Sequence, residues 1–186
     1  MPITGNFREL RDELQRLTIP PDDAGLEWLK TQIELIEALK TRHPHGIALH
    51  TAWNSDLTDV NCYMFALGLA PNEIKNWRDV GIQPDTKTGF IGRLLESKIL
   101  TSCASGAMPQ DGLVFYFTAE GRPMHAGRCA DGVVISKWGD RCTHIWRHGL
   151  WEVPSSYGET VQFFETPSPG DVAKAYITWA KAKWGE

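Results

Sequence analysis

Cys62 is the residue of this chain best placed to act as a nucleophile. It opens an apolar stretch that contains no proline, and Thr58 and Asp59 just before it are residue types that cap helices well. We therefore expect a buried helix with Cys62 about three residues past the cap, among N–H groups that have no helical partner. The positive end of a helix, together with a nearby imidazolium, lowers the pKa of a thiol below its usual value of about 8.5. This position predicts a thiolate near neutral pH.

A structural cysteine is the alternative interpretation of the same residue. Free cysteines are among the most often buried side chains, and one cysteine in an apolar helix is more often part of a core. A histidine placed to accept the thiol proton would make a nucleophile the better interpretation of Cys62.

His125 is the histidine that we expect to fill this role. It lies in an expected strand over 124–129, which the dipeptide Asp131-Gly132 joins to a second expected strand over 133–138. Asp-Gly between two apolar runs is a strong signal for a two-residue hairpin loop. The histidine therefore has a strand to hold it and a neighbouring strand to supply an orienting group.

The register of this hairpin predicts which side chains surround His125. If Ala130 faces Val133, then His125, Ser136 and Trp138 share one face of the sheet and Lys137 points to the other. Ser136 would then be a diagonal neighbour that orients the imidazole of His125.

A second candidate for the orienting role follows the hairpin. His148 lies in a segment that could fold back over the site, although a surface loop is an equally good interpretation of its surroundings.

Secondary structure is predicted from the spacing of apolar residues and from turn residues between short runs. The first half of the chain is helical, and the pattern changes to strands after about residue 106. Helices followed by an antiparallel meander are typical of an α+β domain. The expected helices span residues 7–17, 22–42, 88–99 and 171–184, and the expected strands span 113–117, 124–129, 133–138 and 161–165.

The chain is expected to form one domain. Its 186 residues are enough for one core and few for two. Residues 1–46 are expected to pack as a helical layer on a core that spans 47–186, and whether this layer also covers the site stays open.

Three separate pieces of the sequence resemble one family. An Asn-Cys pair opens the expected helix at Cys62, the run 111–117 reads Asp-Gly-Leu-Val-Phe-Tyr-Phe, and a His-Ala-Gly strand begins at His125. A Gly-Val-Val-Ile-Ser hairpin follows. This order resembles the papain-like cysteine hydrolases of the NlpC type, whose pattern is Asp-Cys-Ser-Gly, Gly-Asp-Leu-Val-Phe-Phe, His-Val-Gly and a further polar residue. The resemblance covers roughly residues 50 to 140.

The resemblance implies a papain-like α+β fold in which Cys62 is the nucleophile and His125 the base. Family members cleave amide bonds, often in bacterial cell-wall peptides, and the superfamily also contains acyltransferases, deamidases and thioesterases. This chemistry needs no cofactor and no metal. Tyr63-Met64 replaces the usual Ser-Gly, and Ser136 stands where a histidine or asparagine is expected, so the third residue is Ser136 or His148. The segment from Ser136 to Gly139 is also similar to uncharacterised papain-like domains of bacteria and their phages.

Composition narrows the possible partners and locations. The net charge of −4 offers no basic surface for nucleic acid or an anionic membrane. The sequence has no apolar run long enough to span a bilayer and no signal-peptide pattern at its start. We therefore expect a chain made in the cytoplasm and exported only by a route without a cleaved signal peptide. The expected substrate is a peptidoglycan stem peptide, by resemblance, or else a cytosolic protein.

Two other functions fit parts of the sequence. A papain-like fold without catalysis would be a binding or regulatory module, with some of the eight tryptophans as its recognition surface. It would keep its activity when Cys62 becomes serine, whereas an enzyme would not. A zinc-binding domain is the other alternative, although its candidate ligands include no Cys-x-x-Cys pair. Those ligands are His125, Cys129, Cys142, His144 and His148.

Overall fold

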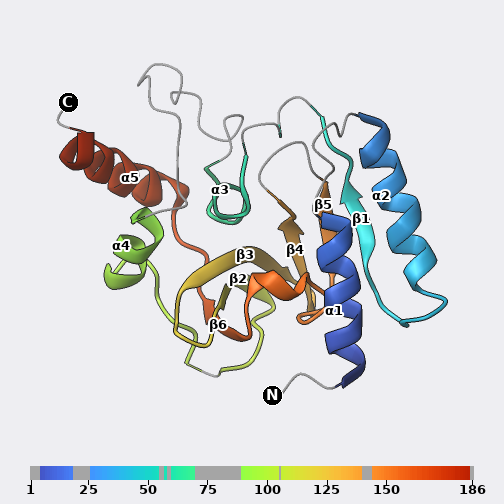
Figure 1. Ribbon diagram of the computed structural model, residues 1–186. Coiled ribbons are helices and arrows are strands. Elements are labelled where there is room, and N and C mark those ends of the chain that lie inside the picture. Colours follow the sequence, from blue (N-terminus) through green and yellow to red (C-terminus); the bar gives the residue numbers. More distant parts are fainter. Residues whose placement is uncertain are drawn as a thin grey trace.

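The computed structural model describes residues 5–18, 26–54, 57, 60–69, 89–104, 106–139 and 144–184. Within these ranges the chain has mixed α+β structure built around a six-stranded antiparallel sheet with the order β1-β5-β4-β3-β2-β6 (Figure 1). The strands are β1 (Ala48–Thr51), β2 (Asp111–Phe117), β3 (Pro123–Ala130), β4 (Val133–Lys137), β5 (Ile145–His148) and β6 (Thr160–Phe164). The helices are α1 (Gly5–Thr18), α2 (Leu26–Leu39), α3 (Cys62–Ala66), α4 (Phe90–Glu96), α5 (Pro169–Trp184) and the 3-10 helix η3 (Ser155–Tyr157).

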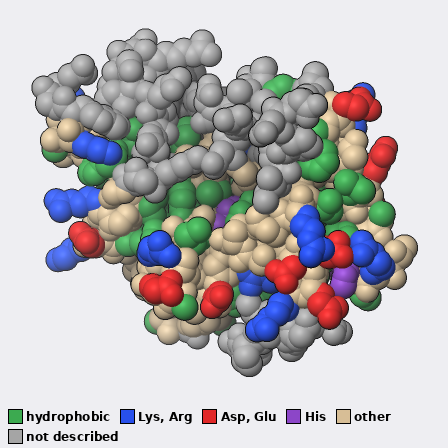
Figure 2. Space-filling model, in the orientation of Figure 1, with side chains coloured by type: hydrophobic (Ala, Val, Ile, Leu, Met, Phe, Trp, Pro, Cys, Tyr) green, Lys and Arg blue, Asp and Glu red, His purple; other side chains and the backbone are tan. Residues whose placement is uncertain are grey.

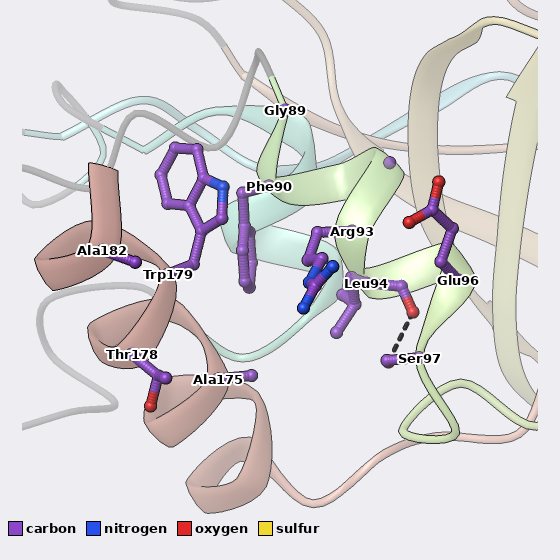
Figure 3. A pocket seen from close by; sticks show the side chains of 11 residues that line it. Gly89, Phe90, Arg93, Leu94, Glu96, Ser97, Ala175, Thr178, Trp179 and Ala182 are labelled. Atoms are coloured by element: carbon purple, nitrogen blue, oxygen red, sulfur yellow. Dashed lines mark hydrogen bonds between the residues drawn. The ribbon is translucent and has the colours of Figure 1, made fainter.

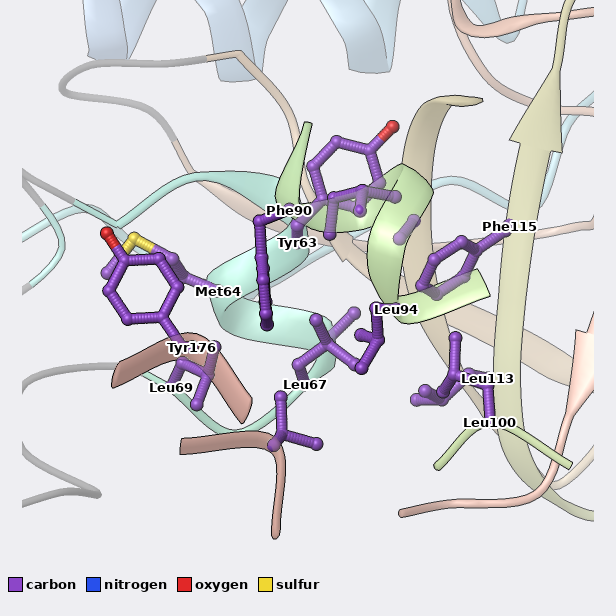
Figure 4. Packing of buried hydrophobic residues seen from close by; sticks show 14 of the residues in the cluster. Tyr63, Met64, Leu67, Leu69, Phe90, Leu94, Leu100, Leu113, Phe115 and Tyr176 are labelled. Carbon is purple, nitrogen blue, oxygen red and sulfur yellow. The ribbon is translucent and has the colours of Figure 1, made fainter. Parts of the chain in front are cut away.

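The sheet separates two hydrophobic clusters, because successive residues of a strand point to opposite faces. Along β2, Leu113, Phe115 and Phe117 belong to one cluster, whereas Val114 and Tyr116 belong to the other. The first cluster joins β2 to α3, α4 and α5 (Figure 4), and we call its side of the sheet the α3 face. The second cluster joins the sheet to α1 and α2, and we call that side the α1 face.

The two N-terminal helices cover the α1 face. Leu10 and Leu14 of α1 and Ile36 and Leu39 of α2 are each at most 2% exposed, and all four belong to the α1-face cluster. Each pair is spaced three or four residues apart, which places its members on one side of a helix. The N-terminal segment is therefore packed on the sheet through a shared core.

The hairpin between β3 and β4 forms at the predicted place. Asp131 and Gly132 have φ values of 49° and 79°, the left-handed pair that a type I′ turn requires. Ala130 pairs with Val133, as the sequence predicts. At the other end of β3 the pairing with β2 shifts by one residue, which leaves Met124 as a bulge.

Most of the predicted elements are confirmed, and two strands were not predicted. β2, β3, β4, β6 and α5 lie where the sequence places them, and α1 includes the whole predicted helix over 7–17. α2 is shorter than predicted, and residues 22–25 lie outside the described ranges. β1 and β5 are additional strands, so His148 lies in a strand rather than in a loop. Every helix in the described ranges is too short or too polar to cross a membrane.

Candidate functional site

Cys62 is the first residue of α3. Asn61 caps this helix, because its Oδ1 accepts a hydrogen bond from the Met64 N–H at 3.0 Å. The predicted caps Thr58 and Asp59 lie outside the described residues, and Cys62 directly follows the cap instead of lying three residues past it. The thiol is half-buried and packs against the α3-face cluster.

His125 lies on the opposite side of the sheet. It pairs with Tyr116 across β2 and β3, so its side chain points to the α1 face. The imidazole is stacked on the Tyr157 ring, with centroids 3.9 Å apart and planes 22° from parallel. Only 1% of the residue is exposed, and Nε2 has no hydrogen-bond partner among the described residues.

Ser136 and His148 form a closed hydrogen-bond chain on the same face. The Trp138 Nε1–H donates to Ser136 Oγ at 3.0 Å, and Ser136 Oγ lies 2.8 Å from His148 Nε2. His148 Nδ1 lies 2.8 Å from the Gly149 carbonyl, which can only accept. The proton of His148 is therefore on Nδ1, and Nε2 accepts the Ser136 hydroxyl proton. This network satisfies a neutral His148.

Burial keeps both histidines neutral at pH 7. It lowers the pKa of His148 to about 4, against the smaller opposing effect of the bond to Gly149. Burial also lowers the pKa of His125 well below its usual value, and the proximity of His148 lowers it further. The facing Tyr116 stays neutral, because burial raises its pKa.

The structure therefore divides the predicted site. His125, Ser136 and His148 lie together on the α1 face, and Cys62 lies on the α3 face. Ser136 bonds to His148 and not to His125, so the predicted orienter serves the other histidine. Figure 2 shows hydrophobic side chains gathered in a hollow at the centre of one face of the molecule, with a histidine among them.

Sequence reasoning assigned no role to three buried or partly buried residues near the predicted site. Tyr157 covers His125, and Arg11 of α1 is 3% exposed and bonded to the backbone around η3. Arg11 directly follows Leu10 on the apolar side of α1, which is a signal for a buried arginine that could have been noticed. Lys137 is fully buried on the α3 face. It directly follows Ser136 in β4, so its side chain points to the opposite face of the sheet.

The zinc interpretation finds no support in the described ranges, which contain no group of three or more His, Cys, Asp or Glu side chains that could hold a metal ion. The Nδ1 of His144 accepts the Trp53 N–H at 2.9 Å, and its Nε2 lies 2.8 Å from the Leu29 carbonyl. Both ring nitrogens of His144 are thus used by the backbone. Cys142 lies outside the described residues.

Two cavities lie away from the histidine pair. The larger, of about 710 Å³, is between α4 and α5, and Figure 3 shows Phe90 and Trp179 beside it, with ring centroids 5.7 Å apart. The smaller, of about 340 Å³, lies between the end of α3 and the start of β2. Neither cavity is lined by Cys62, His125 or His148.

Replacing Ser136 by alanine tests the network around His148. The substitution leaves the buried Trp138 N–H without an acceptor and His148 Nε2 without a donor. We expect the free energy of unfolding to fall by about 1–3 kcal/mol, measured by urea denaturation. Ser156→Ala is the matched control, because that side chain is exposed, and it should change stability by less than about 0.5 kcal/mol. Equal stability of the two variants would contradict the network.

Comparison of the chain with protein-family models, with curated proteins and with solved structures finds no match.

Proposed function

We propose that the protein is a papain-like cysteine hydrolase, a peptidase or amidase that cleaves an amide or related acyl bond. In this proposal Cys62 is the nucleophile and His125 the base. The state of His125 carries the proposal: it is a buried, neutral imidazole whose Nε2 has no hydrogen-bond partner among the described residues. A general base needs a free acceptor nitrogen, and burying one without a partner is costly for stability.

The reaction would proceed in two acyl-transfer steps. The thiol proton of Cys62 passes to Nε2 of His125, and the sulfur attacks the carbonyl carbon. His125 then returns the proton to the leaving amine as the amide bond breaks, which leaves a thioester on Cys62. Water, deprotonated by His125, attacks this thioester and releases the acid and the free thiol. A peptidoglycan stem peptide is the substrate that the sequence resemblance favours.

This mechanism requires His125 to reach the face on which Cys62 lies. The bulge at Met124, directly before His125, is where we place the movement. A bulge that shifts by one residue changes which face the neighbouring side chains point to. His125 would leave its stack on Tyr157 as it turned.

The second candidate is a papain-like binding or regulatory module without catalysis. The observation that favours it is the position of Cys62 and His125 on opposite faces of the sheet. In that case Cys62 contributes to the core of the α3 face, and the buried histidines contribute only to folding.

Alkylation of Cys62 separates the two candidates. Its rate of reaction with iodoacetamide would be followed against pH by mass spectrometry in the native protein, in His125→Ala and in His50→Ala, whose histidine is exposed on β1. For a hydrolase we expect rapid labelling well below the usual thiol pKa of about 8.5, slowed about tenfold or more by His125→Ala and unchanged by His50→Ala. Slow labelling that does not depend on His125 would leave the binding module as the function.

A further inference from the structure

The helix α1 is linked to the segment that covers His125, chiefly through Arg11. Arg11 projects from α1 into the core, and its guanidinium donates to backbone carbonyls of the segment 153–158. That segment contains Tyr157, which is stacked on His125. We propose that Arg11 is a positioning residue for His125, which holds the segment 153–158 and thereby fixes the Tyr157 ring against the imidazole.

The contacts of Arg11 span the whole of this segment. Its Nε donates to the Val153 carbonyl at 3.2 Å, and Nη2 donates to the Pro154 and Ser155 carbonyls, each at 3.4 Å. Nη2 also donates to the Gly158 carbonyl, beyond η3. One planar group thus binds both ends of the turn, which the ammonium of a lysine cannot do from one position.

The charged guanidinium of Arg11 is stabilised by hydrogen bonds to backbone carbonyls. Within the described residues the guanidinium forms no ion pair; beyond the carbonyls it lies over the Trp151 ring, 5.6 Å from the centroid. Burial lowers the pKa of Arg11, because a charge in the core loses its hydration. Gln15, one turn further along α1, adds a second link by accepting the Ser156 N–H at 3.1 Å.

The contacts of Arg11 with the segment 153–158 form what we call the clamp. Tyr157 transmits the effect of the clamp to His125. Its hydroxyl accepts the Gly139 N–H at 2.9 Å, which ties the ring to the end of β4. The ring covers the imidazole and keeps water from it. Among the described residues, the other titratable groups in contact with or close to His125 are Tyr116 and His148. If the clamp is released, water should reach His125 and raise its pKa towards the usual value of about 6.5.

The clamp also bears on the proposed hydrolase, and this consequence alone rests on the proposed function. Because the stack keeps His125 on the α1 face, loosening it should allow the imidazole to reach Cys62 more often. The alkylation rate of Cys62 would then rise in variants that lack the clamp.

The test is an NMR titration of the His125 Cε1 proton in the full chain. Native protein would be compared with Arg11→Met, with Tyr157→Leu and with the double variant. We expect the His125 pKa to rise by about one unit or more in each single variant. The double variant should show no further rise, because both substitutions release the same stack. Arg16→Met, which removes an arginine exposed on the same helix, is the matched control and should leave this pKa unchanged.

Folded Arg11→Met protein with a native His125 pKa would overturn the inference, and so would shifts that add up in the double variant. If Arg11→Met does not fold, Arg11→Lys replaces it, with a smaller rise expected because the charge stays and the planar fork is lost. The titration needs no substrate and does not involve Cys62. A raised His125 pKa with unchanged Cys62 alkylation would therefore support the clamp and count against the hydrolase.

Discussion

Acidification from about pH 6.5 to about pH 4 should lower the free energy of unfolding by about 3 kcal/mol through His148 alone, because burial lowers its pKa from 6.5 to about 4. The sign follows from proton uptake. Below pH 6.5 the unfolded chain binds a proton on His148 and the folded chain does not, so stability is complete above this range and is lost as the pH falls. His125, whose pKa is also lowered by burial, acts in the same direction.

The hydrogen-bond chain explains why a protonated His148 is poorly tolerated. A second proton would go on Nε2, which now accepts the Ser136 hydroxyl proton. The Ser136 hydroxyl would then have to turn away, although its oxygen is already bonded to the Trp138 N–H. Protonation therefore breaks a satisfied buried network as well as placing a charge in the core.

Urea denaturation at a series of pH values measures this effect. His148→Gln cannot take up the proton, so its stability should depend less steeply on pH than that of native protein, while being lower near neutrality. His50→Gln is the control, because that side chain is exposed on β1, and it should keep the native pH dependence. Parallel stability profiles for native protein and His148→Gln would show that His148 titrates normally in the fold.

Replacing Gly158 by alanine should destabilise the protein by about 3 kcal/mol or more. Gly158 has a φ of +122°, and a Cβ there would lie 2.5 Å from the carbonyl oxygen of Phe117. Because this oxygen belongs to the backbone of β2, it cannot move aside as the end of a side chain would. The Gly158 carbonyl also accepts from Arg11, so the substitution disturbs the clamp.

A second glycine separates crowding from backbone strain. Gly132 has a φ of +79°, but a Cβ there would meet no atom within 4 Å. Gly132→Ala should therefore cost only the strain of the left-handed conformation, about 1–2 kcal/mol. Thermal and urea unfolding of both variants would measure the difference, and equal destabilisation would contradict the close approach of Gly158 to Phe117.

The sequence predicts the parts of the fold that local patterns determine. The β3–β4 hairpin is predicted because Asp131 and Gly132 are the residues that a type I′ turn requires. α1 is predicted because its apolar residues recur at helical spacing. The start of α3 was less well determined, because Thr58, Asp59 and Asn61 are all good capping residues and Asn61 is the one that caps.

The strand β5 escaped prediction because it is short and does not alternate cleanly. Its burial follows the pattern buried, buried, exposed, buried, and its last residue, His148, is followed by a glycine, as in many loops. The strand exists because it pairs with both β4 and β1. Such pairing joins distant parts of the chain and cannot be predicted from a local sequence pattern.

The structure brings together three of the four predicted site residues, His125, Ser136 and His148, and leaves Cys62 on the other face of the sheet. The hairpin register correctly puts His125 and Ser136 on one face, since both lie on the α1 face. The hairpin register does not predict the face of the sheet on which α3 packs. This face depends on which side of the sheet the chain passes over before it reaches Cys62. The partner of Ser136 was likewise hidden, because His148 reaches it only through β5.

The position of β1 at the edge of the sheet also has a consequence for synthesis of the chain. Ala48 pairs with Arg147, about a hundred residues later, whereas β2, β3, β4 and β5 pair with their neighbours in sequence. The apolar sides of α1 and α2 therefore leave the ribosome long before the sheet that covers them exists. We expect the β2–β5 meander to form first and α1, α2 and β1 to dock last, so that the nascent chain exposes Leu10 and Leu14 until β5 has been synthesised.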